Sequence, residues 1–281
     1  MEIPTDFYLG KYEVTQEEWE KVMGENPSGF SRMGGDKDAV REIPDADLKR
    51  FPVEYVSWDQ CQIFVEKLNQ LEKVTGWVYR LPNEGEWEHA CRGGGGRPAL
   101  EYEFDYYFDQ PTNTVLPDQA NFNVGEKAFN RTCQVGSYQP NRLGLYEVHG
   151  NVWEWCQDEV MDQGVSKRPT LGGGWELDSA SGRVWFRRSP HPPSYRHQTM
   201  GLRLVRVPAS TASPAAKSSP TAVAPFTDAD VQRIAALPAE QQVAAVVARL
   251  KELNPGLVGA ASHKIADGVV TGLEFIPING P

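Results

Sequence analysis

Three helices are predicted where a capping pair is followed by apolar residues three or four positions apart. The capping pairs are Thr15 with Glu18, Ser57 with Gln60, and Asn83 with Glu86. In such a box the two side chains satisfy free backbone amides of the first turn. The first helix is expected to stop near Gly24, the second near residue 73, and the third at the glycine run 93–96.

The stretch from residue 97 to residue 207 shows little helical periodicity. Short apolar segments alternate there with glycine, proline and asparagine, which is typical of turns and short strands. We expect strands at 7–10, 152–156, 183–188 and 201–206. The pattern therefore predicts a loop-rich fold of few helices and many short strands.

The composition changes sharply after Val207. Residues 208–225 are mostly Ala, Ser, Thr and Pro with one charge, a composition typical of a linker. We therefore divide the chain into a domain at 1–207, a linker at 208–225 and a C-terminal segment at 226–281. That segment is expected to be a small α/β piece, with a helix interrupted at Pro238 and strands around 269–276. With roughly 55 residues it is marginal as an independent domain, which favours a truncated one.

The charge and the apolar pattern of the chain disfavour two classes of partner, nucleic acids and membranes. The net charge is −10 over 281 residues, which disfavours nucleic-acid binding. No run approaches the ~20 apolar residues of a membrane span, and no signal-peptide pattern follows Met1. We expect a cytoplasmic monomer without a nucleic-acid or membrane partner, although a strand so close to Met1 leaves the natural start of the chain open.

The cysteines and histidines do not form the patterns of a metal site. Cys61, Cys91, Cys133 and Cys156 include no CxxC pair, and the five histidines are scattered. We expect isolated reduced thiols in or near the core.

Several segments rich in rare residues follow one another in a fixed order. They are KYEVTQ (11–16), PVEYVSW (52–58), YRLPNEGEWE (79–88), GLYEVHGNVWEW (144–155), GGGW (172–175) and GLR (201–203). This set resembles the formylglycine-generating enzyme, or sulfatase-modifying factor, family over about residues 7–206. The resemblance implies an α+β fold, the loop-rich C-type lectin-like fold of that family, and a bacterial source.

The resemblance also shows where the family's chemistry would lie. Members that make formylglycine oxidise a cysteine of a sulfatase with oxygen and copper(I), which two cysteines hold because this soft ion prefers thiolates. By the family pattern those cysteine positions are Leu177 and Gly182, and a serine position is Gly174. No cysteine follows Cys156. Neither a catalytic residue nor copper is therefore expected.

Calcium is the cofactor that the resemblance favours, because hard cations bind carboxylates and backbone carbonyls. The implied ligands are the side chains of Glu147 and Glu154 and the carbonyls of Gly150 and Val152. The alternative is that Glu154 only accepts hydrogen bonds from turn amides. A second, weaker site would use Asn121 and Phe122, with Glu126 beside the position where the family has an aspartate.

The segment 175–199 would cover the family's active-site groove. It is rich in the aromatic and arginine side chains that dominate binding surfaces, although these arginines could equally pair with nearby acids. The candidate surface residues are Trp175, Glu176, Asp178, Arg183, Trp185, Arg187, Tyr195 and Arg196. In variable proteins related to the family, this surface binds partners.

These residues favour a non-catalytic member of the family that binds a protein or peptide through the 175–199 surface. Two alternatives stay open. One is a formylglycine-generating oxidase that acts on a sulfatase or another protein cysteine. The other is an accessory domain of a larger bacterial signalling protein, because such domains are appended to serine/threonine kinases. No kinase motif occurs in the chain itself.

Overall fold

The computed structural model describes residues 7–72, 76–94, 104–123, 128–187 and 190–209, the single positions 237, 241 and 245, and the backbone of 259–266 and 269–277. The chain forms two compact units, Met1–Ala212 and Ser213–Pro281. This boundary lies five residues beyond the predicted domain end at Val207. The predicted linker and C-terminal helix lie almost wholly outside the described residues.

The described helices of the first unit are short, and the three longest begin at capping pairs. They are α1 (Gln16–Met23), η1 (Lys37–Val40), α2 (Asp45–Leu48), α3 (Trp58–Glu72), α4 (Glu84–Cys91) and η4 (Ser179–Gly182). The boxes at Thr15 and Asn83 are complete, and the side chains of Ser57 and Gln60 each accept the other's backbone amide. The three predicted helices are thus confirmed. The four-residue helices α2 and η1 are too short to leave a periodic signal.

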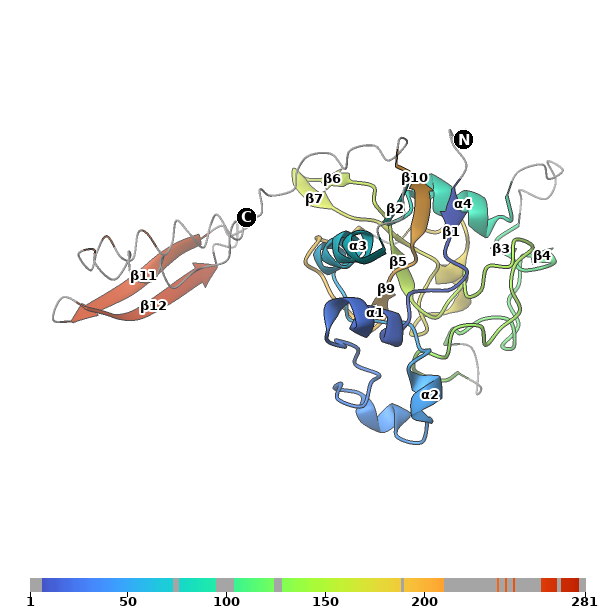
Figure 1. Ribbon diagram of the computed structural model, residues 1–281, viewed down its shortest axis with the longest axis horizontal. Helices are drawn as coiled ribbons and strands as arrows, with labels where there is room; N and C mark the ends of the chain where they lie inside the picture. The colour runs from blue at the N-terminus through green and yellow to red at the C-terminus, as the bar shows by residue number, and fades with distance from the viewer. Residues whose placement is uncertain are drawn as a thin grey trace. The chain divides into compact units, whose positions relative to one another are not determined.

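The strands of the first unit are short and form small sheets. They are β1 (Tyr8–Leu9), β2 (Trp77–Arg80), β3 (Tyr106–Tyr107), β4 (Pro111–Thr112), β5 (Trp153–Trp155), β6 (Val160–Asp162), β7 (Val165–Lys167), β8 (Thr170–Leu171), β9 (Met200–Gly201) and β10 (Val205–Pro208). One antiparallel sheet has the order β1-β10-β2 and joins the two ends of the domain (Figure 1). A second has the order β8-β5-β9, with β5 and β9 parallel. The pairs β3–β4 and β6–β7 complete the unit.

The predicted strand at 183–188 is wrong for the part that the structure describes. The chain turns at Val184 and Trp185 after η4, and the amide of Val184 donates to the carbonyl of Asp105 (2.8 Å). Side chains of this segment form ion pairs with acidic residues elsewhere in the unit. The alternation of charged and apolar residues therefore does not indicate a strand here. The strand expected at 201–206 is divided between β9 and β10.

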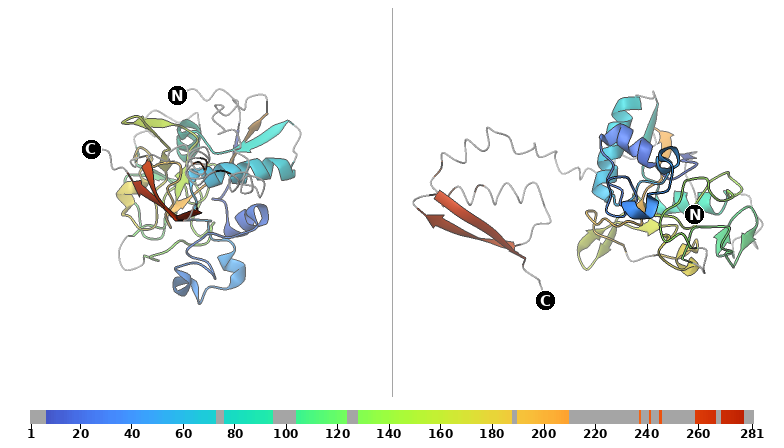
Figure 2. Two further views of the ribbon diagram at one scale, coloured as in Figure 1. Left: turned by 90° about the vertical axis from the view of Figure 1, so that its left-hand side faces the viewer. Right: turned by 90° about the horizontal axis from the view of Figure 1, so that it is seen from below.

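The main core lies between the helices and β5. The rings of Trp19 in α1 and Phe64 in α3 stack at 4.9 Å, and these two helices lie side by side (Figures 1 and 2). Trp153 and Trp155 of β5 are buried in the same cluster. The core therefore fixes β5, the strand that carries Glu154.

The second unit contains one described hairpin, in which β11 (Gly259–Ala266) pairs antiparallel with β12 (Val269–Pro277). The strand expected around 269–276 is confirmed. The sequence of β11 is rich in Gly, Ala and Ser and gave no strand signal.

The four cysteines are free and buried, as predicted, and burial raises the pKa of each thiol. Among the described residues, no helix has the length and apolar character needed to cross a membrane.

Candidate functional site

Two of the three positions at which the family resemblance implies chemistry, Gly174 and Gly182, are packed against aromatic rings. A β-carbon built on Gly182 would lie 2.0 Å from Cζ of Phe122, and one on Gly174 would lie 2.9 Å from Cδ1 of Trp153. Real β-carbons do not approach other atoms this closely. Of the three implied positions, only Leu177 reaches the surface. The space that a side chain at residue 182 would need is filled by the ring of Phe122.

His149 lies directly beneath this glycine. Its Nδ1 is 2.7 Å from the carbonyl of Gly182, and its Nε2 accepts the amide of Tyr107 at 2.9 Å. The neutral ring, with its proton on Nδ1, satisfies both contacts. Burial lowers the pKa of His149 to about 4. The imidazole is thus a neutral structural bridge.

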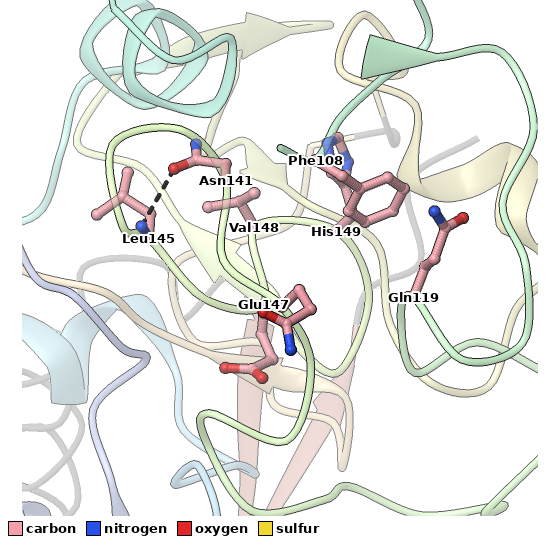
Figure 3. A pocket seen from close by; sticks show the side chains of 8 residues that line it. Phe108, Gln119, Asn141, Leu145, Glu147, Val148 and His149 are labelled. Carbon is pink, nitrogen blue, oxygen red and sulfur yellow. Dashed lines mark hydrogen bonds between the residues drawn. The ribbon is translucent and has the colours of Figure 1, made fainter. Parts of the chain in front are cut away.

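A small cavity beside His149 is too small for a substrate. Figure 3 shows the rings of His149 and Phe108 on one side of it and the carboxylate of Glu147 pointing away from them. The cavity has a volume of about 10 Å³, which is at most the space of one water molecule. A second hollow, a cleft of about 460 Å³ by α1 and α2, is lined by none of residues 175–199.

The implied calcium ligand Glu154 forms a buried ion pair with Arg203. Both side chains are almost fully inaccessible to solvent. Nε of Arg203 donates to both carboxylate oxygens at 3.0 and 3.1 Å, and Nη2 donates to Oε1 at 2.7 Å. Nε1 of Trp87 also donates to Oε2 of Glu154 at 2.6 Å. Each oxygen of Glu154 therefore already has a donor.

Two further buried carboxyl groups face the same arginine. Glu147 accepts the amides of Gly136 (2.8 Å) and Tyr138 (3.3 Å), and Glu13 accepts the side-chain amide of Asn151 (2.6 Å). Burial raises the pKa of Glu13 well above its usual range, and the negative charges of Glu154 and Glu147 raise it further. Burial also raises the pKa of Glu147.

This arrangement does not fit a calcium ion. The carboxylates of Glu147 and Glu154 are engaged by N–H donors, and a guanidinium already supplies the positive charge. Among the described residues, no group of three or more His, Cys, Asp or Glu side chains is arranged to hold a metal. In the second implied site, the Asn121 amide donates to the carbonyl of Arg131 and to Asn151, while Glu126 lies outside the described residues.

The candidate surface residues divide into two groups, and the first is used for packing. Trp175 packs on Phe30, and its indole N–H donates to the carbonyl of Gln198. Tyr195 stacks between His191 (4.2 Å) and His197 (6.3 Å). Two other members also have side-chain partners, since Glu176 accepts from Thr199 and Arg196 lies over the ring of Tyr55. Asp178 is exposed, and its backbone carbonyl accepts the hydroxyl of Ser181.

The second group is Arg183, Trp185 and Arg187. Arg183 pairs with Asp105 at 3.1 Å and lies over the indole of Trp185 at 5.4 Å. The indole N–H of Trp185 donates to the same Asp105 at 2.6 Å. Arg187 pairs with Glu84 (2.9 Å) and with Glu88 of α4. Trp185 nevertheless keeps 52% of its surface exposed.

Sequence reasoning missed Glu13, His149 and Arg203 as parts of this region. Glu13 and Arg203 stand inside the quoted KYEVTQ and GLR segments, and His149 inside GLYEVHGNVWEW. Their positions inside these motifs were the signal that could have identified them. A motif does not show which residues of distant segments contact one another.

Glu54, in the PVEYVSW segment, is a buried acid beside Phe30, the residue on which Trp175 packs. Its Oε1 accepts the amide of Phe30 at 2.9 Å, while Oε2 meets no donor at hydrogen-bond geometry. Burial raises the pKa of Glu54 to about 8, which the amides of Phe30 and Gly29 partly offset.

We expect Glu54→Gln to stabilise the protein at alkaline pH and to have little effect near pH 4.5. The folded chain holds a proton on Glu54 that the unfolded chain releases, so the wild type loses about 2 kcal/mol between pH 5 and pH 7 through this group. Urea denaturation of both proteins at each pH measures the difference. Parallel pH profiles would contradict the assignment.

Comparison with known proteins places the first unit in a family. The profile of the Sulfatase-modifying factor enzyme 1-like domain matches residues 1–208. The chain is 32% identical to the chaperone protein LppX of Paenibacillus barcinonensis, over 61% of this chain and 70% of that protein. It is also 32% identical to the inactive C-alpha-formylglycine-generating enzyme 2 of Bos taurus, over 54% of this chain and 49% of that protein.

The fold also resembles a solved structure, the Treponema denticola variable protein 1. The TM-score is 0.57 at 26% identity, and the match covers 71% of this chain and 84% of that one. Together with the mixed helices and short strands, this confirms the predicted α+β, C-type lectin-like fold.

Proposed function

Because the chain belongs to the family of the sulfatase-modifying factor enzyme 1-like domain, we propose that it is a non-catalytic member that binds a protein or peptide through the 175–199 surface. A cytoplasmic location and a monomeric state are parts of this proposal. The proposal depends on one arrangement of side chains, the exposed indole of Trp185 and the groups that hold it.

Trp185 carries the proposal because it is both exposed and fixed. An exposed tryptophan would normally exchange between rotamers. Here the hydrogen bond to Asp105 and the guanidinium of Arg183 hold the indole in one position. A rigid aromatic side chain loses little conformational entropy on binding, and tryptophan and arginine are the residues most enriched at interface hot spots.

The absence of the family's reaction is supported by packing. The positions 174 and 182 have no room for a side chain as the chain is folded. One relative carries the word "inactive" in its name and another is named a chaperone. The first name favours a non-catalytic role, and the second favours a role in binding.

We expect Trp185→Ala to abolish the retention of specific partners by the immobilised protein. Phe129→Ala is the matched control, because Phe129 is also exposed (48%) and lies under an arginine, Arg131, at 5.3 Å. Proteins retained from a lysate of the source cell are quantified by mass spectrometry for wild type and both variants. Loss of the same proteins by both variants, or by neither, would count against the surface.

The oxidase alternative is tested separately. The chain is incubated with copper(I), oxygen, a reducing thiol and a peptide containing Cys-x-Pro-x-Arg, beside an active member of the family. We expect no aldehyde in the mass spectrum, because no thiolate is available at positions 177 and 182. Conversion of the cysteine would refute the non-catalytic assignment.

A further inference from the structure

The side chain of Arg203 makes its hydrogen bonds only to oxygens. These are the two carboxylate oxygens of Glu154, the carbonyl of Gly10 at 3.0 Å and the carbonyl of Tyr146 at 2.8 Å. The four oxygens come from two segments far apart in the sequence, one around Gly10 and the other from Tyr146 to Glu154. Carboxylate and carbonyl oxygens of this kind are also the ligands that calcium selects.

The guanidinium is the compensating charge of a region rich in acid. Arg203 is completely buried, and its pKa is set by two opposing effects: burial lowers it, but the adjacent Glu154 carboxylate and the charges of Glu13 and Glu147 raise it above its usual range. A second cation in contact with Glu154 would have to share that carboxylate with the guanidinium at short range, which is costly in a low-dielectric interior.

From this geometry we infer that Arg203 serves as a built-in cation on Glu154, one of the calcium ligands that the family resemblance implies, so that the protein folds without calcium and gains a calcium site only when the guanidinium is removed. Removal would leave Glu154 and the carbonyls of Gly10 and Tyr146 without their main donors. The negative charges of Glu147 and Glu13, which act on Arg203, would also favour another cation in its place. The proposal is independent of the 175–199 surface.

The test compares the response of wild type and Arg203→Ala to calcium and to terbium. Melting temperatures are measured in EGTA and in 1 mM calcium, and terbium luminescence is excited through tryptophan, since the indole of Trp87 contacts Glu154 directly. We expect no shift and no sensitised emission for wild type. For Arg203→Ala we expect a rise in Tm of about 5 °C with calcium, together with terbium emission.

Two further variants make the result specific. Arg41→Ala removes an arginine from the exposed pair with Glu42 and is expected to behave as wild type. Arg203→Ala combined with Glu154→Gln is expected to lose the calcium response. An Arg203→Ala chain that folds only when calcium is present would support the inference. A calcium shift in wild type, no response of Arg203→Ala, or a variant that stays unfolded with calcium would each overturn it.

Discussion

Glu154→Gln is expected to lower the free energy of unfolding by about 3–5 kcal/mol, because it leaves the fully buried guanidinium of Arg203 without its counter-charge. The amide retains the shape of the carboxylate but adds a donor that faces the donors of Arg203 and Trp87. Urea denaturation monitored by tryptophan fluorescence measures the loss.

The cost of breaking the pair must be separated from the value of the pair itself. Replacing both partners, as in Glu154→Leu with Arg203→Met, is expected to recover much of the loss, because two apolar side chains need no counter-charge. Glu42→Gln, in the exposed pair with Arg41, is expected to change stability by less than about 0.5 kcal/mol. A loss below about 1 kcal/mol for Glu154→Gln would show that the pair is solvated.

The parts of the fold that could be predicted from sequence are those fixed by local interactions. Thr15 and Glu18 lie three residues apart and cap α1 whatever the rest of the chain does. The strands depend on partners from distant segments, such as Trp153 with Met200, so the sequence indicated where some strands stand but not which strands pair. Segment 183–188 was mispredicted for this reason, since its described residues, 183–187, pair with no strand.

The residues of the candidate site divide in the same way, into those that a local motif identifies and those that only the folded chain brings together. Glu147 and Glu154 could be selected from one motif, but Arg203 lies 49 residues from Glu154 and Glu13 lies 139 residues from Val152. No local pattern reveals that an arginine stands beside those acids. Likewise, the arginines of the 175–199 surface could be predicted by type, but their ion pairs with Glu84, Glu88 and Asp105 depend on the folded chain.

Gly182→Ala is expected to destabilise the protein by about 3 kcal/mol, because the added methyl group enters the space of the Phe122 ring. The ring cannot move freely, since Phe122 is buried and a β-carbon built on Gly173 or Gly150 would also lie within 3.2 Å of it. Gly35→Ala is the control, because nothing lies within 4 Å of a β-carbon there and its backbone is not in the left-handed region. It should leave stability unchanged or raise it slightly.

A double-mutant cycle with Phe122→Ala tests whether the ring is the cause. Phe122→Ala alone should cost about 3–5 kcal/mol through the cavity it creates, but the methyl group of Gly182→Ala then has space. The double variant should therefore be more stable than the sum of the single losses by about 1–3 kcal/mol. Additive losses would mean that the backbone of Gly182, and not the ring, resists a side chain.

The same clash would oppose a cysteine at this position. The variant with Leu177→Cys and Gly182→Cys should therefore bind copper(I) poorly until Phe122 is also replaced by alanine, and a copper(I) titration would measure the difference.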